Sequence, residues 1–246
     1  MTNRSILTTV ALALLLALST SAQEVKKLRV LVTVGGHGFD QKPFYEMLDK
    51  LPGISYKKID MPKDAGMLKP GLEKDYDVIL MYDMVPRITP EQQQAFVELL
   101  KTGIGVVSWH HNLAAHPEWD EFRKIIGGKY ANNDMTIDGK PQKKSNWTEG
   151  IAYKVHIADA DHPITKGLKD FELHDEVYGS RWISPDAKVL LTTDNPKSDP
   201  ALAWTTTYGK SRVFYLLPGH GKEAWTNPVF QEILGRGLRW AAGESK

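Results

Sequence analysis

The sequence predicts an α/β protein built on a doubly wound, mostly parallel sheet with a β-rich elaboration. Three features predict it: short apolar runs that end at glycine or a polar residue, amphipathic segments between those runs, and a change to polar sequence after residue 128. Alternating strand and helix signals are typical of a parallel sheet covered by helices. We expect residues 129–200 to add strands to the same domain.

The first half of the expected sheet alternates regularly between strand and helix. Lys27–Val34 is a near-continuous apolar run that ends at two glycines, which predicts a buried strand followed by a turn. Gln41–Leu51 carries its apolar residues on one helical face. Ile54–Ile59 alternates as a strand does, and Asp77–Tyr82 predicts a third, buried strand.

The next helix is expected to begin at a cap. Thr89 precedes Pro90, a residue favoured at the first helical position, and Gln92 stands where a capping box needs it. The strand Val106–Trp109 and the short helix Glu118–Ile126 complete this half. Because the carboxyl ends of parallel strands share one edge of a sheet, side chains that follow them should meet there.

The second half is expected to be richer in strands. Ile151–Ile157 and Val189–Thr193 are short strand signals, and Ala201–Thr205 with Arg212–Leu217 predicts a hairpin. The last helix should begin after Asn227 as its cap. Its apolar residues recur at helical spacing and predict a face on the core, formed by Phe230, Ile233, Leu234, Leu238 and Trp240.

The N-terminus has the pattern of a secretory signal peptide over residues 1–22. Arg4 supplies the positive charge, an apolar run follows, and Thr20-Ser21-Ala22 gives the small residues of a cleavage site. The run is too short for a membrane span, which needs about 20 apolar residues. We therefore expect a periplasmic or secreted protein whose mature part, residues 23–246, is one domain.

Composition and charge exclude several classes of function. The chain has 31 basic and 30 acidic residues, and residues 1–22 contain one of the basic residues and none of the acidic ones. This balance, without any basic stripe, argues against a nucleic-acid partner. The absence of Cys excludes disulfides, Cys-ligated zinc and the thiol that a glutaminase would need. The sequence leaves open whether the chain forms a homo-oligomer.

Four of the eight histidines follow expected strands. His37 comes after two glycines, His110 and His111 end the strand GVVSW, and His220 lies between two glycines. Imidazole titrates near neutrality and ligates metals, so these residues predict a site at the sheet edge. Because neighbours on an extended strand point to opposite faces, one of His110 and His111 should face the site while the other packs.

A second polar cluster is the segment HDEVYG. Alternation on a strand places His174, Glu176 and Tyr178 on one side and Asp175 on the other. A carboxylate beside a phenol can transfer protons or ligate a metal. A solvated edge strand would show the same polar pattern.

Two tryptophans, Trp109 and Trp225, flank the histidine loops. An aromatic face beside polar groups suits the apolar face of a sugar ring. Packing in the core is the alternative role for either tryptophan.

Several of these residues lie in longer characteristic segments of the sequence. The segments are VLVTVGGHGFD, GVVSWHHNLAAHPEWDEFRKIIGG, DHPITKGL, HDEVYG and RVFYLLPGHG followed by NPVFQEILGRGLRWAAG. Together they resemble the trehalose-utilisation (ThuA-like) family over almost all of residues 27–243. That resemblance implies a flavodoxin-like, class I glutamine-amidotransferase-like fold. By this resemblance, the site residues of the family correspond to His37, His110, Asp175, Glu176, Tyr178, Gly219 and His220. Many members carry a further His after a Gly-Gly pair, where this chain has Asn132 and Asn133.

The resemblance also implies a role in the breakdown of trehalose and other glycosides, beside oxidoreductases that make 3-keto sugars. We expect acid–base or metal-assisted hydrolysis or elimination of a glycoside or 3-keto-glycoside. The alternative is a non-catalytic sugar-binding module that kept an amidotransferase-like scaffold and lost its nucleophile.

The expected roles divide the candidate residues into three groups. His110 and Glu176 are the expected acid and base. The carbohydrate is expected to contact His37, Trp109, His111, Asp175, Tyr178 and His220. A divalent metal, if bound, is expected on His37, His110 and His220.

Overall fold

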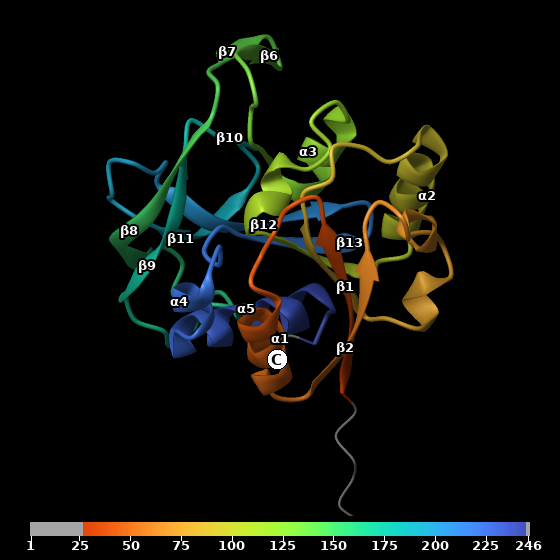
Figure 1. Ribbon diagram of the computed structural model, residues 1–246, viewed down its shortest axis with the longest axis horizontal. Coiled ribbons are helices and arrows are strands. Elements are labelled where there is room, and N and C mark those ends of the chain that lie inside the picture. Colours follow the sequence, from red (N-terminus) through yellow and green to blue (C-terminus); the bar gives the residue numbers. More distant parts are fainter. Residues whose placement is uncertain (1–26, 245–246) are drawn as a thin grey trace, which may run out of the picture.

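The apolar runs of the sequence form the centre of one mixed sheet in the computed structural model, which describes residues 27–244 (Figure 1). Within those residues nine strands pair in the order β2 (Ile54–Asp60), β1 (Leu28–Gly35), β3 (Val78–Asp83), β4 (Gly105–Trp109), β13 (Ser211–Leu216), β12 (Ala201–Tyr208), β11 (Lys188–Thr192), β8 (Asn146–Ile157) and β9 (Phe171–Gly179).

The sheet is parallel in one half and antiparallel in the other. The four pairings from β2 through β1, β3 and β4 to β13 are parallel. The four pairings from β13 through β12, β11 and β8 to β9 are antiparallel. The predicted α/β class is confirmed, and the sheet of the described residues is mixed, with four parallel and four antiparallel pairings. Segment 129–200 supplies β8, β9 and β11, which extend the sheet through antiparallel hairpin-like returns.

The remaining elements connect these strands. The helices are α1 (Gln41–Lys50), α2 (Pro90–Leu100), α3 (Asp120–Ile126), α4 (Lys222–Trp225) and α5 (Pro228–Ala241). Short 3-10 turns are η1 (Ala65–Met67), η2 (Leu72–Lys74) and η3 (His110–Ala114). Two small ribbons pair β5 (Gly128–Lys129) with β10 (Trp182–Ile183) and β6 (Met135–Ile137) with β7 (Lys140–Gln142).

The predicted helix starts are confirmed. Thr89 accepts a hydrogen bond from the backbone N–H of Gln92, and the Gln92 side chain accepts one from the Thr89 N–H, which completes the capping box of α2. Asn227 accepts from the N–H groups of Val229 and Phe230 and so caps α5. Each cap satisfies amide groups that have no partner inside the helix.

Helices cover both faces of the sheet. Phe214 and Tyr215 are neighbours on β13 and therefore project to opposite faces. Phe214 packs on Gly237 of α5, where an added Cβ would lie 2.4 Å from its ring. Tyr215 stacks on Trp204, whose indole N–H donates to the Ile126 carbonyl at the end of α3. Helices α5 and α3 thus lie on opposite sides of β13.

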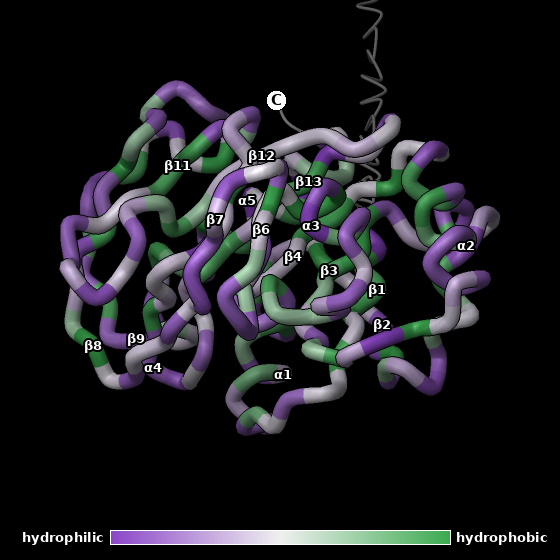
Figure 2. The backbone as a smooth tube through the Cα atoms, turned by 90° about the horizontal axis from the view of Figure 1, so that it is seen from above, coloured by the Kyte–Doolittle hydropathy of each residue, from purple (hydrophilic) through white to green (hydrophobic). Residues whose placement is uncertain are grey.

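The core follows the apolar strands, which form the hydrophobic centre of the tube view in Figure 2. Of the expected core face of α5, Phe230, Ile233, Leu234 and Leu238 are buried. Trp240 is only partly buried, which corrects the prediction: its ring lies at the end of the helix against His162 and under the Arg212 guanidinium.

One buried acid in the sheet gives a testable pH effect. Asp83 ends β3, is fully buried and accepts a hydrogen bond from the Thr33 hydroxyl, while its second carboxylate oxygen has no partner. Burial raises the Asp83 pKa from 3.8 to about 6. A raised carboxyl pKa means that the folded state binds more protons than the unfolded state, so stability is lost as pH rises between these two values.

Asp83→Asn removes this titration. As pH rises from about 4 to about 6, we expect the wild-type free energy of unfolding to fall by about 2 kcal/mol relative to that of the variant, the part of the two-unit shift that lies within this range. Urea unfolding of both proteins across this range measures the difference. Parallel curves would show that Asp83 does not titrate in this way.

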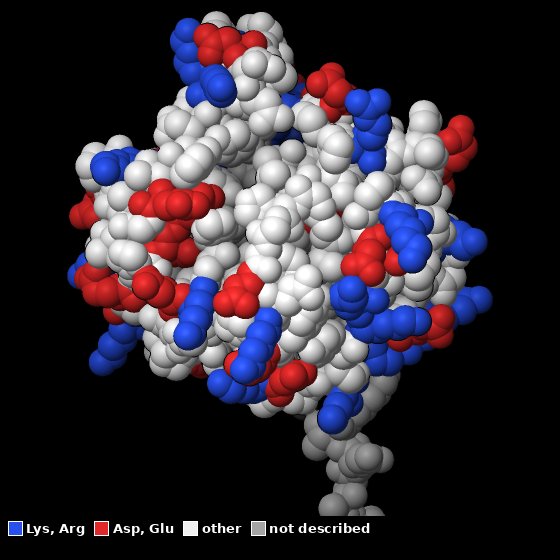
Figure 3. All heavy atoms as spheres, in the orientation of Figure 1, with Lys and Arg blue, Asp and Glu red and all other residues white. Residues whose placement is uncertain are grey.

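The predicted signal peptide, residues 1–22, lies outside the described residues. In the part of the chain that the structure does describe, no helix combines the length and apolar character that crossing a membrane requires. The face shown in Figure 3 carries charges of both signs around a central area of uncharged atoms.

Candidate functional site

Side chains that follow three parallel strands meet in one pocket of about 350 Å³ at the carboxyl edge of the sheet. The loop after β1 supplies His37, η3 after β4 supplies His111, and the loop after β13 supplies His220. Strand β9 adds Glu176 and Tyr178. The complete lining is His37, Met84, His111, Ala114, Tyr130, Asn132, Trp147, Glu149, Glu176, Tyr178 and His220.

Three imidazoles on the pocket wall touch one another. His37 stacks on His111 with ring centroids 4.4 Å apart, and its centroid lies 5.7 Å from that of His220. Burial lowers the pKa of His37, and the nearby His220 and His110 lower it further. His111 is more deeply buried, which holds its pKa well below the ordinary value. Both rings are therefore neutral near pH 7.

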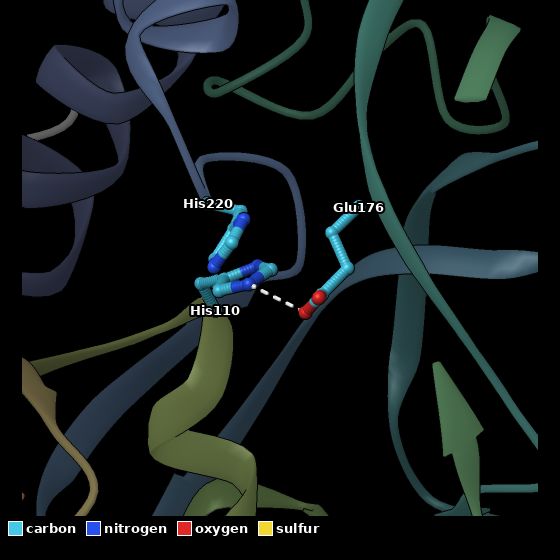
Figure 4. Close-up of side chains that lie close together, drawn as sticks. All are labelled: His110, Glu176 and His220. Carbon is cyan, nitrogen blue, oxygen red and sulfur yellow. Dashed lines mark hydrogen bonds and ion pairs between the residues drawn. The ribbon is translucent and has the colours of Figure 1, made fainter. Parts of the chain in front are cut away.

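His110 lies behind the pocket wall and does not line it. Its backbone adopts a φ of 52°, a left-handed conformation that turns the chain from β4 into η3. Its Nδ1 lies 2.6 Å from the Leu217 carbonyl oxygen, and its Nε2 lies 3.2 Å from Glu176 Oε1 and 3.1 Å from the Tyr178 hydroxyl (Figure 4). The fully buried ring contacts side chains that do line the pocket, among them Glu176, Tyr178 and His220.

This arrangement corrects the expectation for the histidine pair. One member does face the pocket, but it is His111, and the expected acid–base residue His110 is the one that packs. The reason is that the strand ends at Trp109, so the two histidines belong to a 3-10 turn. Strand alternation does not apply to them.

The carboxylate of Glu176 is ionised in this environment. Burial alone would raise its pKa, but the hydrogen bond and charge of His110 and the charge of His220 lower the pKa below its ordinary value. Burial raises the pKa of Tyr178 well above 10, so its phenol keeps its proton. The pocket thus holds a fixed negative charge beside a hydrogen-bond donor.

Asp175 positions the His220 loop and does not line the histidine pocket. Its carboxylate accepts hydrogen bonds from the backbone N–H of Gly219, at 2.5 Å, and of His220, at 3.1 Å. Its side chain is buried and lies on the opposite side of β9 from Glu176. Asp175 borders the adjoining hollow, and its expected contact with a carbohydrate stays a prediction.

Gly219 is required for this loop. Its φ is 120°, and an added Cβ would lie 2.2 Å from the indole nitrogen of Trp109. Gly219→Ala should therefore displace the His220 loop and destabilise the protein by about 3 kcal/mol, from overpacking and backbone strain together. Thermal unfolding measures the loss, and Gly221→Ala is the control, because its Cβ would meet nothing within 4 Å. Equal stability of the two variants would contradict the role of Gly219.

Both tryptophans expected to face a sugar are core residues. Trp109 is fully buried, stacks on Phe44 and donates its indole N–H to the Pro218 carbonyl at 2.8 Å. Trp225 is buried as well and donates to the Gly219 carbonyl. Trp109 therefore supports the loop that carries His220 and is not available to a ligand.

A different tryptophan lines the pocket. Trp147 on β8 is 57% exposed and lies opposite Tyr178 in the β8–β9 register, so the two side chains share a face. Tyr130 and Asn132, from the segment after β5, complete this side. The sequence signal for Trp147 is an aromatic residue in a polar segment, NWTEG, which offers no apolar neighbours to bury it.

A second hollow of about 400 Å³ adjoins the first and shares Glu149, Glu176 and His220 with it. His174 borders it and pairs with Glu223 on the surface. A larger hollow of about 710 Å³ lies elsewhere, beside α3 and β12, but the Arg123 it contains is already paired with Asp120 and Asp138. The histidine pocket therefore remains the candidate site.

In the described residues, His110, Glu176 and His220 offer three possible metal ligands whose donor atoms all lie within 4.8 Å of one another. The expected set was His37, His110 and His220. In the observed cluster Glu176 stands in place of His37.

Comparisons with known proteins agree with this fold. A family model for ThuA, described as trehalose utilisation, matches residues 29–241. A ThuA-like protein from Parabacteroides merdae ATCC 43184 superimposes with a TM-score of 0.74 at 21% identity, covering 90% of this chain and 92% of its own. A ThuA-like protein from Bacteroides uniformis ATCC 8492 gives 0.66 at 21% identity, covering 91% and 94%.

A cytoplasmic protein from Salmonella typhimurium LT2 shares the fold with a TM-score of 0.62 at 14% identity, covering 87% of this chain and 99% of its own. No curated protein matches the sequence. The family model covers most of the chain, and the structural matches share its architecture. The chain therefore belongs to the ThuA family, which is described as acting in trehalose utilisation.

Proposed function

We propose that the protein is an enzyme of carbohydrate breakdown that eliminates the glycosidic oxygen from a 3-keto-glycoside. The observation that carries the proposal is one pocket lined by the neutral imidazole of His37, an ionised carboxylate, Glu176, and a phenol donor, Tyr178. Membership of a family described as trehalose utilisation supports a carbohydrate as the substrate.

The chemistry follows from the acidity of a C–H bond beside a ketone. His37 accepts the proton from the carbon next to the carbonyl, and the electron pair forms a C=C bond as the adjacent glycosidic C–O bond breaks. The protonated His37 then gives its proton to the departing oxygen. The products are an unsaturated keto sugar and a free alcohol, and no water or oxidant is consumed.

The opposite wall stabilises the charge that develops on the ketone oxygen. The Tyr178 hydroxyl can donate to that oxygen, and Glu176 with His110 would hold a cation that could stabilise the same charge. His110 holds Glu176 and Tyr178 in place through these contacts, and its own ring does not line the pocket.

Trp147 gives the pocket a surface for the sugar ring. Its exposed indole lies beside the polar side chains of Asn132 and Glu149. This combination of an aromatic face and hydrogen-bonding groups is typical of pockets that orient a polar ligand with apolar faces.

A turnover screen tests the proposal. Wild-type protein is incubated with matched pairs of unmodified and 3-keto disaccharides, and the released sugar and unsaturated product are measured by mass spectrometry. We expect both products from keto substrates alone. Binding of these sugars without any turnover would refute the enzyme and support the alternative, a sugar-binding module.

We also propose export to the periplasm or the medium, based on the pattern of residues 1–22. Expression in a Gram-negative host with its own leader should give a mature chain that begins near Gln23. Intact-mass measurement of the exported protein checks the start. Recovery of the full-length chain from the cytoplasm alone would contradict export.

A further inference from the structure

The hydrogen bonds of His110 leave a lone pair facing a carboxylate. The Leu217 carbonyl can only accept, so the contact of 2.6 Å fixes a proton on Nδ1 of His110. In the neutral ring Nε2 then carries a lone pair, and it lies 3.2 Å from Glu176 Oε1. Two acceptors at this distance repel each other unless a cation lies between them.

Tyr178 supplies one proton for these two acceptors. Its hydroxyl lies 3.1 Å from His110 Nε2, and it can donate to that nitrogen or to the Glu176 carboxylate, but not to both. The remaining acceptor still needs a positive partner. Either a second proton on His110 or a metal ion between the two side chains meets this need.

A third donor makes the metal the better partner. The His220 imidazole lies over His110, with ring centroids 5.1 Å apart, and approaches the gap between His110 and Glu176 (Figure 4). Its backbone is held by Asp175, while its ring has ring contacts but no hydrogen bond among the described residues. An imidazole fixed at its backbone and free at its ring nitrogens is suited to ligation.

The distances fit a small divalent ion. Zn²⁺ binds imidazole and carboxylate at about 2.0–2.1 Å, so two ligands of a tetrahedral site lie about 3.3 Å apart. His110 Nε2 and Glu176 Oε1 already span 3.2 Å. All three donors lie within 4.8 Å, so only a small movement of the His220 loop tip closes the site. The Leu217 carbonyl supplies the second hydrogen bond that a ligating imidazole usually makes.

We propose that His110, Glu176 and His220 bind one divalent metal ion of the zinc type, with a fourth position open to the pocket. Two imidazoles, one carboxylate and an open position are the ligand set of catalytic zinc sites. The proposal rests on the proposed function, because it concerns the same pocket, and it names the cation that would assist the reaction there. The open position would take the ketone oxygen of the substrate, which a Lewis acid polarises.

The test is direct metal binding to chain 23–246 made without a polyhistidine tag. After treatment with a chelator, the protein is titrated with Zn²⁺ by calorimetry, and native mass spectrometry counts the bound ions. We expect one Zn²⁺ per chain and no comparable binding of Mg²⁺, which prefers oxygen ligands. His220→Ala and Glu176→Gln should each weaken Zn²⁺ binding by at least about 100-fold, more than a partner outside the ligand set usually contributes.

His174→Ala is the matched control, because His174 is exposed, also pairs with a glutamate and borders the neighbouring hollow. Its Zn²⁺ affinity should equal that of the wild type. Absence of Zn²⁺ binding to the wild type, binding unchanged in His220→Ala and Glu176→Gln, or binding lost in His174→Ala would each overturn the site.

The metal site and the proposed function can fail separately. If the chelator-treated protein binds no Zn²⁺ but still turns over keto-glycosides, the metal site is wrong and the proposed function stands. A second proton on His110 would then supply the positive charge beside Glu176. If Zn²⁺ binds as described but no sugar is turned over, the metal site stands and the proposed function is wrong.

Discussion

Replacing His37 with asparagine should lower the turnover of a 3-keto-glycoside by about 10²- to 10⁴-fold, the usual contribution of a general base. His37 is a neutral imidazole that lines the same pocket as the ionised Glu176. Asparagine keeps a polar side chain of similar reach but cannot accept the C–H proton. Steady-state kinetics with a 3-keto disaccharide measure the effect, and kcat should fall more than KM rises.

The fold of this variant should be intact. His37 is half-buried in a loop after β1, and polar residues at loop tips contribute little to the core. His174→Asn is the matched control, because that histidine is exposed and lies outside the histidine pocket. Equal kcat values for His37→Asn and the wild type would show that the proton goes to another group.

Replacing Trp109 with alanine should lower the free energy of unfolding by about 3–5 kcal/mol. The side chain is fully buried, contacts Phe44 of α1 and Phe230 of α5, and donates to the Pro218 carbonyl. Its loss leaves a cavity between two helices and a buried carbonyl without its partner. For a chain of this size the expected fall in Tm is roughly 10 °C.

Trp147→Ala provides the opposite case with the same change of residue. Trp147 is 57% exposed, so the free energy of unfolding of Trp147→Ala should stay within about 0.5 kcal/mol of that of the wild type. The affinity of this variant for the sugar should fall instead, because the exposed indole that would contact the sugar ring is lost. A large loss of stability in Trp147→Ala, or none in Trp109→Ala, would contradict the assignment of the two tryptophans.

The parallel half of the fold could be predicted from the sequence because its signals are local. The apolar runs of β1 and β3 and the caps at Thr89 and Asn227 each depend on a few neighbouring residues. The positions of His37 and His220 follow from the same signals, since each comes directly after a buried strand. The polar segment HDEVYG, read as a strand, indicated Glu176 and Tyr178 of β9, and both do line the pocket.

The rest of the site depends on pairing between distant segments. Trp147 reaches the pocket because β8 pairs with β9 in a register that sets it opposite Tyr178, and a shift between Thr148 and Ile151 interrupts that register. Nothing within residues 146–157 specifies this partner. The role of Asp175 likewise depends on a contact with Gly219, 44 residues away along the chain.

The reversal of His110 and His111 has a local cause that residue type does not reveal. A left-handed backbone at a histidine is uncommon, and the sequence GVVSWHHN continues as a strand would. The positive φ of His110 starts the 3-10 turn at that residue, and the His110 ring consequently lies behind the side chains that line the pocket.

The central claim is that this pocket removes a C–H proton beside a sugar ketone. Exchange of that proton with solvent tests it most directly. A 3-keto-glucoside is incubated with the protein in D₂O, and NMR follows the proton on the carbon next to the ketone. We predict that the wild type replaces this proton by deuterium or eliminates the aglycone, and that His37→Asn does neither above the uncatalysed rate. Equal exchange with and without wild-type protein would contradict the claim.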